Sequence, residues 1–356
     1  MDQYQVNNSF LVLFLAPVRA YLEDDSISEI LINGPSDVYV ERRGRLERVD
    51  ARFVSEQALR AAAANIAKSV GRLLDEGNPR LDARLPDGSR VHAVIPPLSR
   101  IGTVIAIRKF SRETLTIEKM MSFGSLDEPT RLLLRALVLL HKNVLVSGAT
   151  SSGKTCVLNV LSSYIPEGER VIVIEDASEL QLQQAHVVPM ETRPPDKHGE
   201  GEVTVRDLTK SALRLRPDRI VIGEIRGGES LDLIQALNTG HAGSMSTIHA
   251  NSPEDALRRL ETCALLGGVE IPLRALRAQV VSGVDAIIHT ARLSDGSRKI
   301  VAVSEVLPLE DGEYRLSALQ RWRTESIGAD GTVSGKFERL NTPTFSDEAQ
   351  IYGVEL

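Results

Sequence analysis

The residues GATSSGKT, at positions 148–155, constrain the fold of this chain more than any other stretch of its sequence. They match the pattern G-x-x-x-x-G-K-[ST], they follow a β-branched run at 143–148, and a helical pattern begins directly after them. Gly148 and Gly153 allow the backbone to wind so tightly that its N–H groups converge on an anion, and the positive end of the following helix adds to the attraction. The sequence therefore predicts a strand–loop–helix unit that binds phosphate groups.

We call residues 148–155 the phosphate loop. Lys154 is predicted to contact the outer phosphates of a nucleotide, and Thr155 is predicted to supply an oxygen ligand to Mg²⁺. The predicted nucleotide contacts run from the loop into the first turn of the helix: Gly148, Ala149, Thr150, Ser151, Ser152, Gly153, Lys154, Thr155 and Cys156.

Segments on either side of the phosphate loop alternate between strand and helix patterns. Short β-branched runs occur at 143–148, 170–176, 219–224 and 243–250. Helical patterns separate them at 153–165, 204–216 and 230–238. This alternation predicts an α/β domain in which helices cover both faces of a mostly parallel sheet.

The first part of the chain has a different pattern. Strand-like runs lie at 28–34, at 37–49 with a hairpin turn at Gly44, at 89–97 and at 103–110, and a helix capped by Ser55 is expected over 55–74. Because chains longer than about 250–300 residues usually split, two domains are expected in 356 residues. We predict a smaller α+β domain at 1–110, a linker at 111–118 within a polar stretch that extends to 129, and the larger domain at 119–356.

Composition excludes several classes of protein. A formal net charge of −6 and an aromatic content of 4% argue against a protein that coats nucleic acid. Two cysteines are too few for a disulfide framework, which fits a reducing compartment. The apolar run FLVLFLA at 10–16 is shorter than the roughly 20 residues of a membrane span, so we expect it to form the buried or partner-facing part of a first helix. These features predict a chain that is made and kept inside the cell.

Carboxylates follow two of the predicted strands. Glu175 and Asp176 end one strand and Glu224 ends another, which is where parallel sheets place residues that orient water and ligate Mg²⁺. Gly223 occupies the position that is usually an Asp in nucleotide hydrolases. We predict Glu224 as the catalytic carboxylate and Thr155, Glu175 and Glu224 as candidate Mg²⁺ ligands, with solvated acids at strand ends as the alternative.

Arginines are frequent between these strands, and an arginine often stabilises the charge on a transferring phosphoryl group. The candidates are Arg193, Arg206, Arg214, Arg216 and Arg226. The spacing of Arg206 and Arg214 predicts one shared helix face. For each candidate, a surface position or a structural ion pair is the alternative.

The stretch TGHAGSMSTIHANSPED, at 239–255, carries two histidines. A metal site formed by His241 and His249 is disfavoured, because a strand is expected between them and no cysteine lies nearby. Ser252, Pro253 and Asp255 are the expected start of a helix. His249 is thus placed at a strand end beside the nucleotide and near Glu224, where we predict that it senses the phosphate state. For His241 a structural role and a sensing role remain open.

The motifs GATSSGKT, VIEDASELQLQ, LRLRPDRIVIGEIRGGE and NTGHAGSMSTIHANSPEDALRRLE together resemble the secretion and pilus ATPases of type II and type IV systems. In that family they are the Walker A motif, the Asp box, the modified Walker B motif and the His box. The segments NPRLDARLPDGSRVHAVIPP, IRKF, ETRPP and GTVSGKFERLNTPTF look most like the CpaF branch, which powers Tad pili. The resemblance covers roughly residues 22–356.

The resemblance implies a RecA-like ATPase domain, preceded by the smaller α+β domain, in a homohexamer that uses ATP and Mg²⁺. Nucleotide would lie between the two domains, with Arg90 and Arg108 as candidate contacts from the first domain and His241 and His249 in the His box. The partner would be an inner-membrane platform protein of a pilus or secretion system, with peripheral attachment to the cytoplasmic face of that membrane and no nucleic acid.

Two other functions remain open from the sequence. The basic hairpin ERRGRLER, at 41–48, would suit a ring that moves or licenses nucleic acid, although Glu41 and Glu47 interleave with its arginines. The second open function is an interaction module that nucleotide binding controls without turnover. The presence of both Lys154 and Glu224 argues against it.

Overall fold

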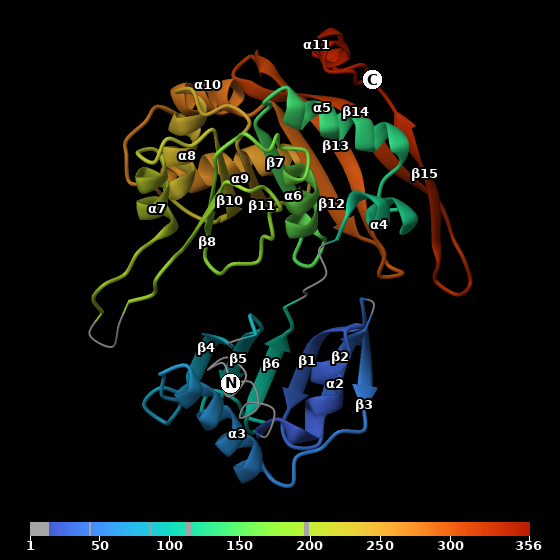
Figure 1. Ribbon diagram of the computed structural model, residues 1–356. Helices are drawn as coiled ribbons and strands as arrows, with labels where there is room; N and C mark the ends of the chain where they lie inside the picture. Colours follow the sequence, from blue (N-terminus) through green and yellow to red (C-terminus); the bar gives the residue numbers. More distant parts are fainter. Residues whose placement is uncertain (1–13, 43, 86, 111–114, 196–198) are drawn as a thin grey trace. The chain divides into compact units, whose positions relative to one another are not determined.

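The chain divides into two compact units, unit 1 at Met1–Glu113 and unit 2 at Thr114–Leu356. A computed structural model describes residues 14–42, 44–85, 87–110, 115–195 and 199–356 (Figure 1). Residues 10–13 of the apolar run and residues 111–114 of the predicted linker therefore lie outside the described part. The rest of that linker is partly helical, because α4 begins at Ile117.

Unit 1 contains a six-stranded sheet in which every neighbouring pair is antiparallel, in the order β3-β2-β1-β6-β5-β4. Its strands are β1 (Ile27–Asn33), β2 (Val38–Arg42), β3 (Arg45–Val49), β4 (Arg80–Arg84), β5 (Arg90–Val94) and β6 (Val104–Arg108). The chain enters the unit through the short helices η1 (Ala16–Val18) and α2 (Arg19–Glu23), where Leu15 and Val18 are buried. The predicted hairpin at Gly44 is present between β2 and β3.

The one long helix described in unit 1 is α3 (Glu56–Ser69), which packs its apolar face on the sheet. Ser55 caps it as predicted, by accepting a hydrogen bond from the N–H of Ala58. The helix ends at Ser69, before the predicted end at 74, because Gly71 adopts a φ of 71°. The N–H of Gly71 bonds the carbonyl of Lys68 and the N–H of Arg72 bonds that of Ala67. This is the hydrogen-bond pattern of a Schellman motif, which stops the helix.

Unit 2 contains a nine-stranded sheet in the order β15-β14-β13-β12-β7-β11-β10-β8-β9. The strands are β7 (Val144–Gly148), β8 (Val171–Glu175), β9 (Val187–Glu191), β10 (Arg219–Ile225), β11 (Met245–His249), β12 (Ala286–Arg292), β13 (Arg298–Glu310), β14 (Glu313–Ile327) and β15 (Val333–Arg339). From β12 to β9 every pair is parallel, so the predicted parallel sheet is confirmed there.

Helices cover both faces of this sheet, each over its own apolar core (Figure 1). One face carries α4 (Ile117–Ser122), α5 (Glu128–Leu139), α6 (Lys154–Ser162) and α11 (Ser346–Ile351). The other carries α7 (Val205–Ala212), α8 (Glu229–Leu237), α9 (Pro253–Leu265) and α10 (Leu273–Gly283). Apart from the edge strand β9, the parallel strands are largely buried on both sides, which explains their continuous β-branched runs.

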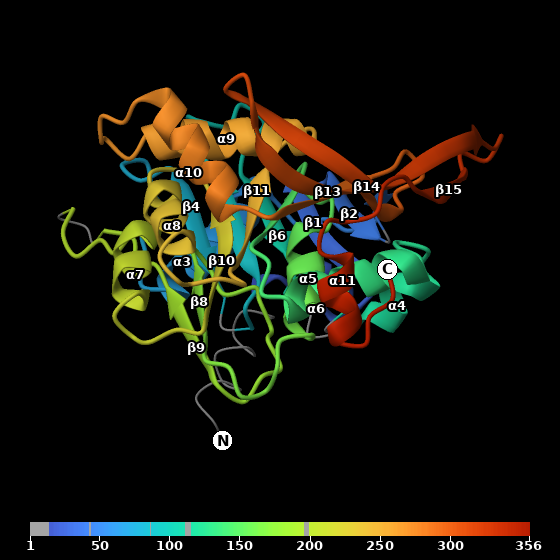
Figure 2. The ribbon, with the colours of Figure 1, turned by 90° about the horizontal axis from the view of Figure 1, so that it is seen from above.

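The antiparallel strands β13, β14 and β15 extend the sheet at one side, and Figure 2 shows the β14–β15 hairpin projecting away from the helices of unit 2. These three strands were not predicted from the sequence. Their residues alternate charged and apolar positions as half-exposed strands do, but the region entered the predictions only through its resemblance to a family.

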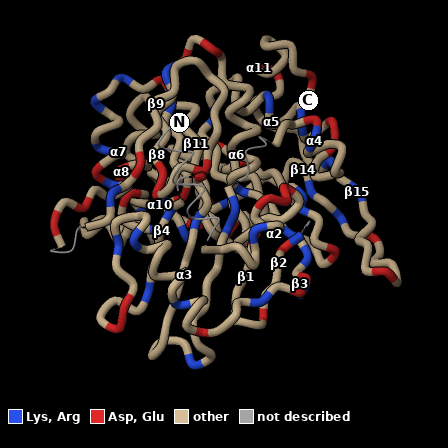
Figure 3. The backbone as a smooth tube through the Cα atoms, turned by 60° about the horizontal axis from the view of Figure 1, so that its bottom comes forward, with Lys and Arg blue, Asp and Glu red and all other residues tan. Residues whose placement is uncertain are grey.

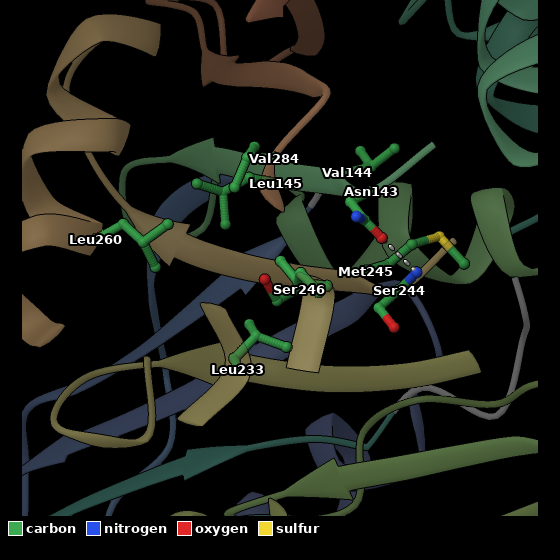
Figure 4. A pocket seen from close by; sticks show the side chains of 10 residues that line it. Asn143, Val144, Leu145, Leu233, Ser244, Met245, Ser246, Leu260 and Val284 are labelled. Atoms are coloured by element: carbon green, nitrogen blue, oxygen red, sulfur yellow. Dashed lines mark hydrogen bonds between the residues drawn. The ribbon is translucent and has the colours of Figure 1, made fainter. Parts of the chain in front are cut away.

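Figure 4 shows a small cavity of about 10 Å³ beside the first residues of β7 and β11. The side chain of Asn143 closes it, with its Oδ1 accepting a hydrogen bond from the N–H of Ser244 at 3.1 Å. Such a volume is about the size of one water molecule, so this cavity has no room for a nucleotide. Within the described residues we find no helix with the length and apolar character to cross a bilayer.

Candidate active site

The candidate site lies at the opposite edge, where the parallel strands β7, β8, β10 and β11 end. The phosphate loop follows β7, and its bends are at Gly148, Ser151 and Gly153, with φ values of 153°, 60° and 101°. A side chain at position 148 would place its Cβ 2.4 Å from the carbonyl oxygen of Thr290. Glycine is therefore required at 148 by both conformation and space.

Lys154 begins α6 and turns its side chain back over the loop. Its Nζ donates to the carbonyl oxygens of Gly148 and Ala149, both at 3.1 Å, and lies 3.2 Å from Nδ1 of His249. Although the ammonium group is buried, it thus has polar partners. Thr155 and Cys156 follow in the first helical turn and are half-buried.

His249 is the last residue of β11, and its ring lies between two charged groups. Nδ1 faces Lys154, and Nε2 lies 2.5 Å from Oε1 of Glu224. Because an ammonium group can only donate, Nδ1 must accept and Nε2 must carry the proton that faces Glu224. Burial, together with the charge of Lys154, lowers the pKa of His249 against the opposing effect of Glu224. The imidazole is therefore neutral at pH 7.

Glu224 lies on β10 at an irregularity of the sheet, since the register with β11 shifts between Ile222 and Ile225. The shift means that β10 has one residue more than β11 at this point, as in a β-bulge, and bulges change the direction of side chains at strand ends. Oε2 of Glu224 accepts a hydrogen bond from Nε of Arg226 at 2.8 Å, and Nη1 of Arg226 donates to Oδ2 of Asp176 at 3.0 Å. Lys154, His249, Glu224, Arg226 and Asp176 thus form one continuous chain of polar contacts, which we call the site network.

Glu175, a predicted Mg²⁺ ligand, has a structural contact in the turn after β8. Its Oε1 accepts hydrogen bonds from the N–H groups of Glu179 and Leu180 at 2.9 and 3.0 Å, and the side chain is 5% exposed. Burial raises the pKa of this carboxyl group. Glu175 therefore orders the turn after β8 through Oε1, and its catalytic and Mg²⁺-binding roles stay predictions.

The position of the Glu175 side chain also explains why residue 223 is glycine. A Cβ at position 223 would lie 2.9 Å from Cγ of Glu175, which is closer than side chains approach. The position is thus glycine because the side chain of Glu175 fills the space beside it.

The predicted arginines are dispersed. Arg206 donates to Oδ2 of Asp232 at 2.6 Å and to the carbonyl of Gly267 at 3.0 Å, which is a structural ion pair between α7 and α8. The predicted helix face shared by Arg206 and Arg214 is wrong, because α7 ends at Ala212 and Arg214 lies in the turn beyond it. Arg193 donates to the carbonyl of Gly201 at 2.6 Å and is exposed. Their predicted catalytic roles would require another subunit.

In unit 1, Arg90 and Arg108 are directly opposite each other on β5 and β6, and Arg84 is opposite Arg90 on β4. Cross-strand partners point to the same side of a sheet, so the three arginines line one face. Their contact with nucleotide stays a prediction.

His241 lies before the first residue of β11, whereas the phosphate loop follows the last residue of β7. In register, Met245 is opposite Val144 and His249 is opposite Gly148, so the whole strand separates His241 from the loop. Its Nδ1 lies 3.3 Å from the carbonyl of Ala236. Within the subunit the ring of His241 thus contacts the backbone of α8, and its nucleotide contact stays a prediction. The predicted cap at Ser252 is present, with its Oγ accepting from the N–H of Asp255 at 3.1 Å.

No group of three or more His, Cys, Asp or Glu side chains among the described residues is arranged to hold a metal ion. Nucleotide sites rarely need such a group of side chains, because Mg²⁺ is usually bound by one or two protein oxygens together with phosphates and water. The half-buried Thr155, in the first turn of α6, fits this arrangement. Oε1 of Glu224 faces His249 and its Oε2 faces Arg226, so the contact of Glu224 with Mg²⁺ stays a prediction.

Sequence reasoning missed the residues of β12 that contact the phosphate loop and the residue directly before it. His289 shares a hydrogen bond between its Nδ1 and Oγ of Ser147 at 2.8 Å, and Oγ1 of Thr290 lies 2.8 Å from Oγ of Ser152. Nothing in the local pattern HTAR indicates this, because it depends on β12 pairing in parallel with β7.

A family model described as "Type II/IV secretion system protein" matches residues 14–315. A protein of Mycobacterium tuberculosis named "Putative conjugal transfer protein MT3759" is 36% identical over 319 residues, which is 88% of this chain and 89% of that protein. "Type IV secretion system protein PtlH" of Bordetella pertussis is 33% identical over 318 residues, or 81% of this chain and 92% of that protein.

A solved structure of the pilus retraction motor PilT with bound ADP covers 97% of this chain and 86% of its own, with a TM-score of 0.55 and 19% identity. The Legionella pneumophila ATPase DotB gives a TM-score of 0.56 at 18% identity and covers 84% of this chain and 82% of its own. These likenesses show the fold, which is the predicted RecA-like α/β domain preceded by a smaller α+β domain.

Proposed function

This chain belongs to the family of type II/IV secretion system proteins and is an ATP hydrolase of that family, and we propose that it works as a hexameric motor. Its hydrolysis of ATP would drive domain motion that powers the assembly, or the retraction, of a type IV or Tad pilus, or the secretion of a protein across the envelope. The single observation that carries the proposal is the site network, which connects the phosphate loop to the candidate catalytic carboxylate.

In the proposed reaction Lys154 leaves the carbonyl oxygens of Gly148 and Ala149 for the outer phosphates of ATP, which are stronger acceptors. Glu224 then orients the attacking water with the oxygen that Nε2 of His249 faces. Mg²⁺ bound to the phosphates and Thr155 would neutralise negative charge on the transferring group.

His249 would report the state of the phosphates, because it contacts both Lys154 and Glu224. When Lys154 moves toward phosphate, Nδ1 loses its donor, and the contact between Nε2 and Glu224 changes with it. Arg226 provides the second partner of Glu224 and extends this coupling to Asp176. The neutral imidazole can change partners without a change of net charge.

The finer assignment follows the resemblance to the CpaF branch and the separate first unit. We infer a ring of six copies, a Tad pilus system, an inner-membrane platform protein as partner and peripheral attachment to the cytoplasmic face of that membrane. Arg90 and Arg108 would contact nucleotide from unit 1.

The test is ATP hydrolysis by the purified full chain and its Lys154→Ala and Glu224→Gln variants, measured as phosphate release. Glu224→Gln keeps the shape of the side chain but not its charge, and we expect turnover to fall about 100-fold or more. Lys210→Ala, a charge removal at an exposed position of α7, is the control and should leave turnover unchanged. A Lys154→Ala protein that hydrolyses ATP as fast as the parent would refute the proposal, and a wild-type chain that binds ATP without releasing phosphate would favour the interaction module.

A ring that acts on nucleic acid is the second candidate, and the name of the mycobacterial relative refers to conjugal transfer. The basic hairpin β2–β3 gives it little support, because Arg42 pairs with Asp24 at 2.7 Å and Arg48 pairs with Asp37 at 2.8 Å. Figure 3 shows acidic and basic positions interspersed along the chain. Turnover that rises on adding DNA and falls steeply with salt would favour this candidate.

A further inference from the structure

We propose that Thr290 and Arg298, on the antiparallel hairpin β12–β13, are positioning residues that keep the phosphate loop in its anion-binding shape. They flank the hairpin turn, at the same sheet edge as the loop, and neither belongs to a motif of the nucleotide site. The proposal rests on the proposed nucleotide contact at 148–155 and adds the residues that shape it.

Thr290 contacts the loop on its inner side. Its Oγ1 lies 2.8 Å from Oγ of Ser152 and donates to the carbonyl oxygen of Ser147 at 3.2 Å. Both Thr290 and Ser152 are buried, so these bonds do not compete with water. Because Thr290 is opposite Gly148 in the parallel register, one hydroxyl group bridges the start of the loop and its middle.

Arg298 contacts the loop on its outer side. Its Nε donates to the carbonyl oxygen of Ser151 at 2.9 Å, and its Cδ would lie 3.7 Å from a Cβ on Gly153. Ser151 has a φ of 60°, a left-handed conformation that a serine adopts only when its surroundings require it. The bond to Arg298 fixes the carbonyl of this residue, so that the neighbouring N–H groups can face inward.

The hairpin turn itself is anchored to β15. Asp295 accepts hydrogen bonds from the N–H of Ser297 at 2.9 Å and from the N–H of Val333 at 3.0 Å. A continuous path therefore runs from the first residue of β15 through Asp295 and Arg298 to the phosphate loop. The C-terminal strands are in this way physically connected to the nucleotide site.

The experiment measures the affinity of the full chain for a fluorescent ADP analogue together with kcat and KM for ATP. Thr290→Val replaces the hydroxyl group with a methyl group of similar shape, and Thr290→Ser keeps the hydroxyl group. Arg298→Gln removes the guanidinium group, and Arg315→Gln removes an exposed arginine from the far end of the same sheet, where its partner is Glu310.

Loss of one or two hydrogen bonds should weaken ADP binding about three- to tenfold in Thr290→Val and Arg298→Gln. KM for ATP should rise by a similar factor while kcat changes less than about twofold, a split that simple loss of folded protein would not produce. Thr290→Ser should bind nearly as the parent does, and Arg315→Gln should be unchanged.

Equal affinity of the parent, Thr290→Val and Arg298→Gln would overturn the inference, and so would a Thr290→Ser protein as weak as Thr290→Val. ADP binding by the Lys154→Ala variant that is as tight as that of the parent would instead contradict the proposed nucleotide site. The two failures are therefore distinguishable.

Discussion

His249 is the residue on which the chemistry of the site depends most closely, because its two ring nitrogens face groups of opposite charge. Lys154 lies 3.2 Å from one nitrogen and Glu224 lies 2.5 Å from the other. A change at either group alters the contact of the ring with the second group, which is the property expected of a sensor.

We predict that His249→Ala lowers kcat more than it lowers nucleotide affinity, because Lys154 and the loop backbone remain while Glu224 loses a partner. The expected loss is about 10- to 100-fold in kcat, with less than about a threefold change in the dissociation constant for ADP. Lys210→Ala, at an exposed position of α7, is the control and should retain turnover. Equal losses of affinity and kcat in His249→Ala would contradict the sensor role.

The lowered pKa of His249 predicts a pH dependence. Between that lowered value and 6.5, the unfolded chain binds a proton that the native imidazole does not, so this residue makes the free energy of unfolding rise with pH across the window and level off above it. Turnover should be flat above pH 6.5 and should fall only below the lowered pKa of His249, where the imidazolium forms in the folded protein. Because burial also lowers the pKa of His289, the parent must be compared with His249→Gln. Urea unfolding at pH 5.5 and 7.5 should show a smaller pH effect in the variant, and an identical effect would contradict the assignment.

Secondary-structure elements were predictable where their signals are local. The alternation of β-branched runs identified β7, β8, β10 and β11, and the loop motif identified the start of α6. The predicted length of α7 was wrong because Leu213 and Leu215 continue its apolar spacing, although the chain leaves the helix after Ala212 and Arg216 adopts a φ of 54°. The contacts of Thr290 and Arg298 could not be predicted, since they depend on pairing between strands that are more than a hundred residues apart.

At the end of β10 we predict that Gly223→Ala is destabilising because its methyl group would meet Cγ of Glu175 at 2.9 Å. The expected cost is about 1–3 kcal/mol of unfolding free energy. In a chain that carries Glu175→Ala the space is free, so Gly223→Ala should cost much less there. A double-mutant cycle by urea denaturation measures this coupling, and additive effects would show that the two residues do not compete for space.

The whole molecule consists of two units with separate cores, and the candidate catalytic groups of the site network all belong to unit 2. Arg90 and Arg108 belong to unit 1, and within the subunit Arg206 is already paired with Asp232. An arginine from unit 1 or from another copy would add to Arg226 and Arg298, which lie beside the candidate catalytic groups within unit 2. Such a contribution would suit an assembly better than an isolated chain.

A closed ring makes the activity of each subunit depend on its neighbours, since head-to-tail interfaces pass motion from one copy to the next. With ATP, the assembled protein should have six times the 38.9 kDa mass of the chain in light scattering. Mixing the parent with increasing fractions of Lys154→Ala should then reduce turnover more steeply than the fraction of parent chains, because one inactive subunit interrupts the cycle of a whole ring. Exchange of subunits is verified with a labelled chain of each kind. Turnover that falls in simple proportion, in mixtures shown to exchange, would mean that each site works alone and that the ring is not a coupled motor.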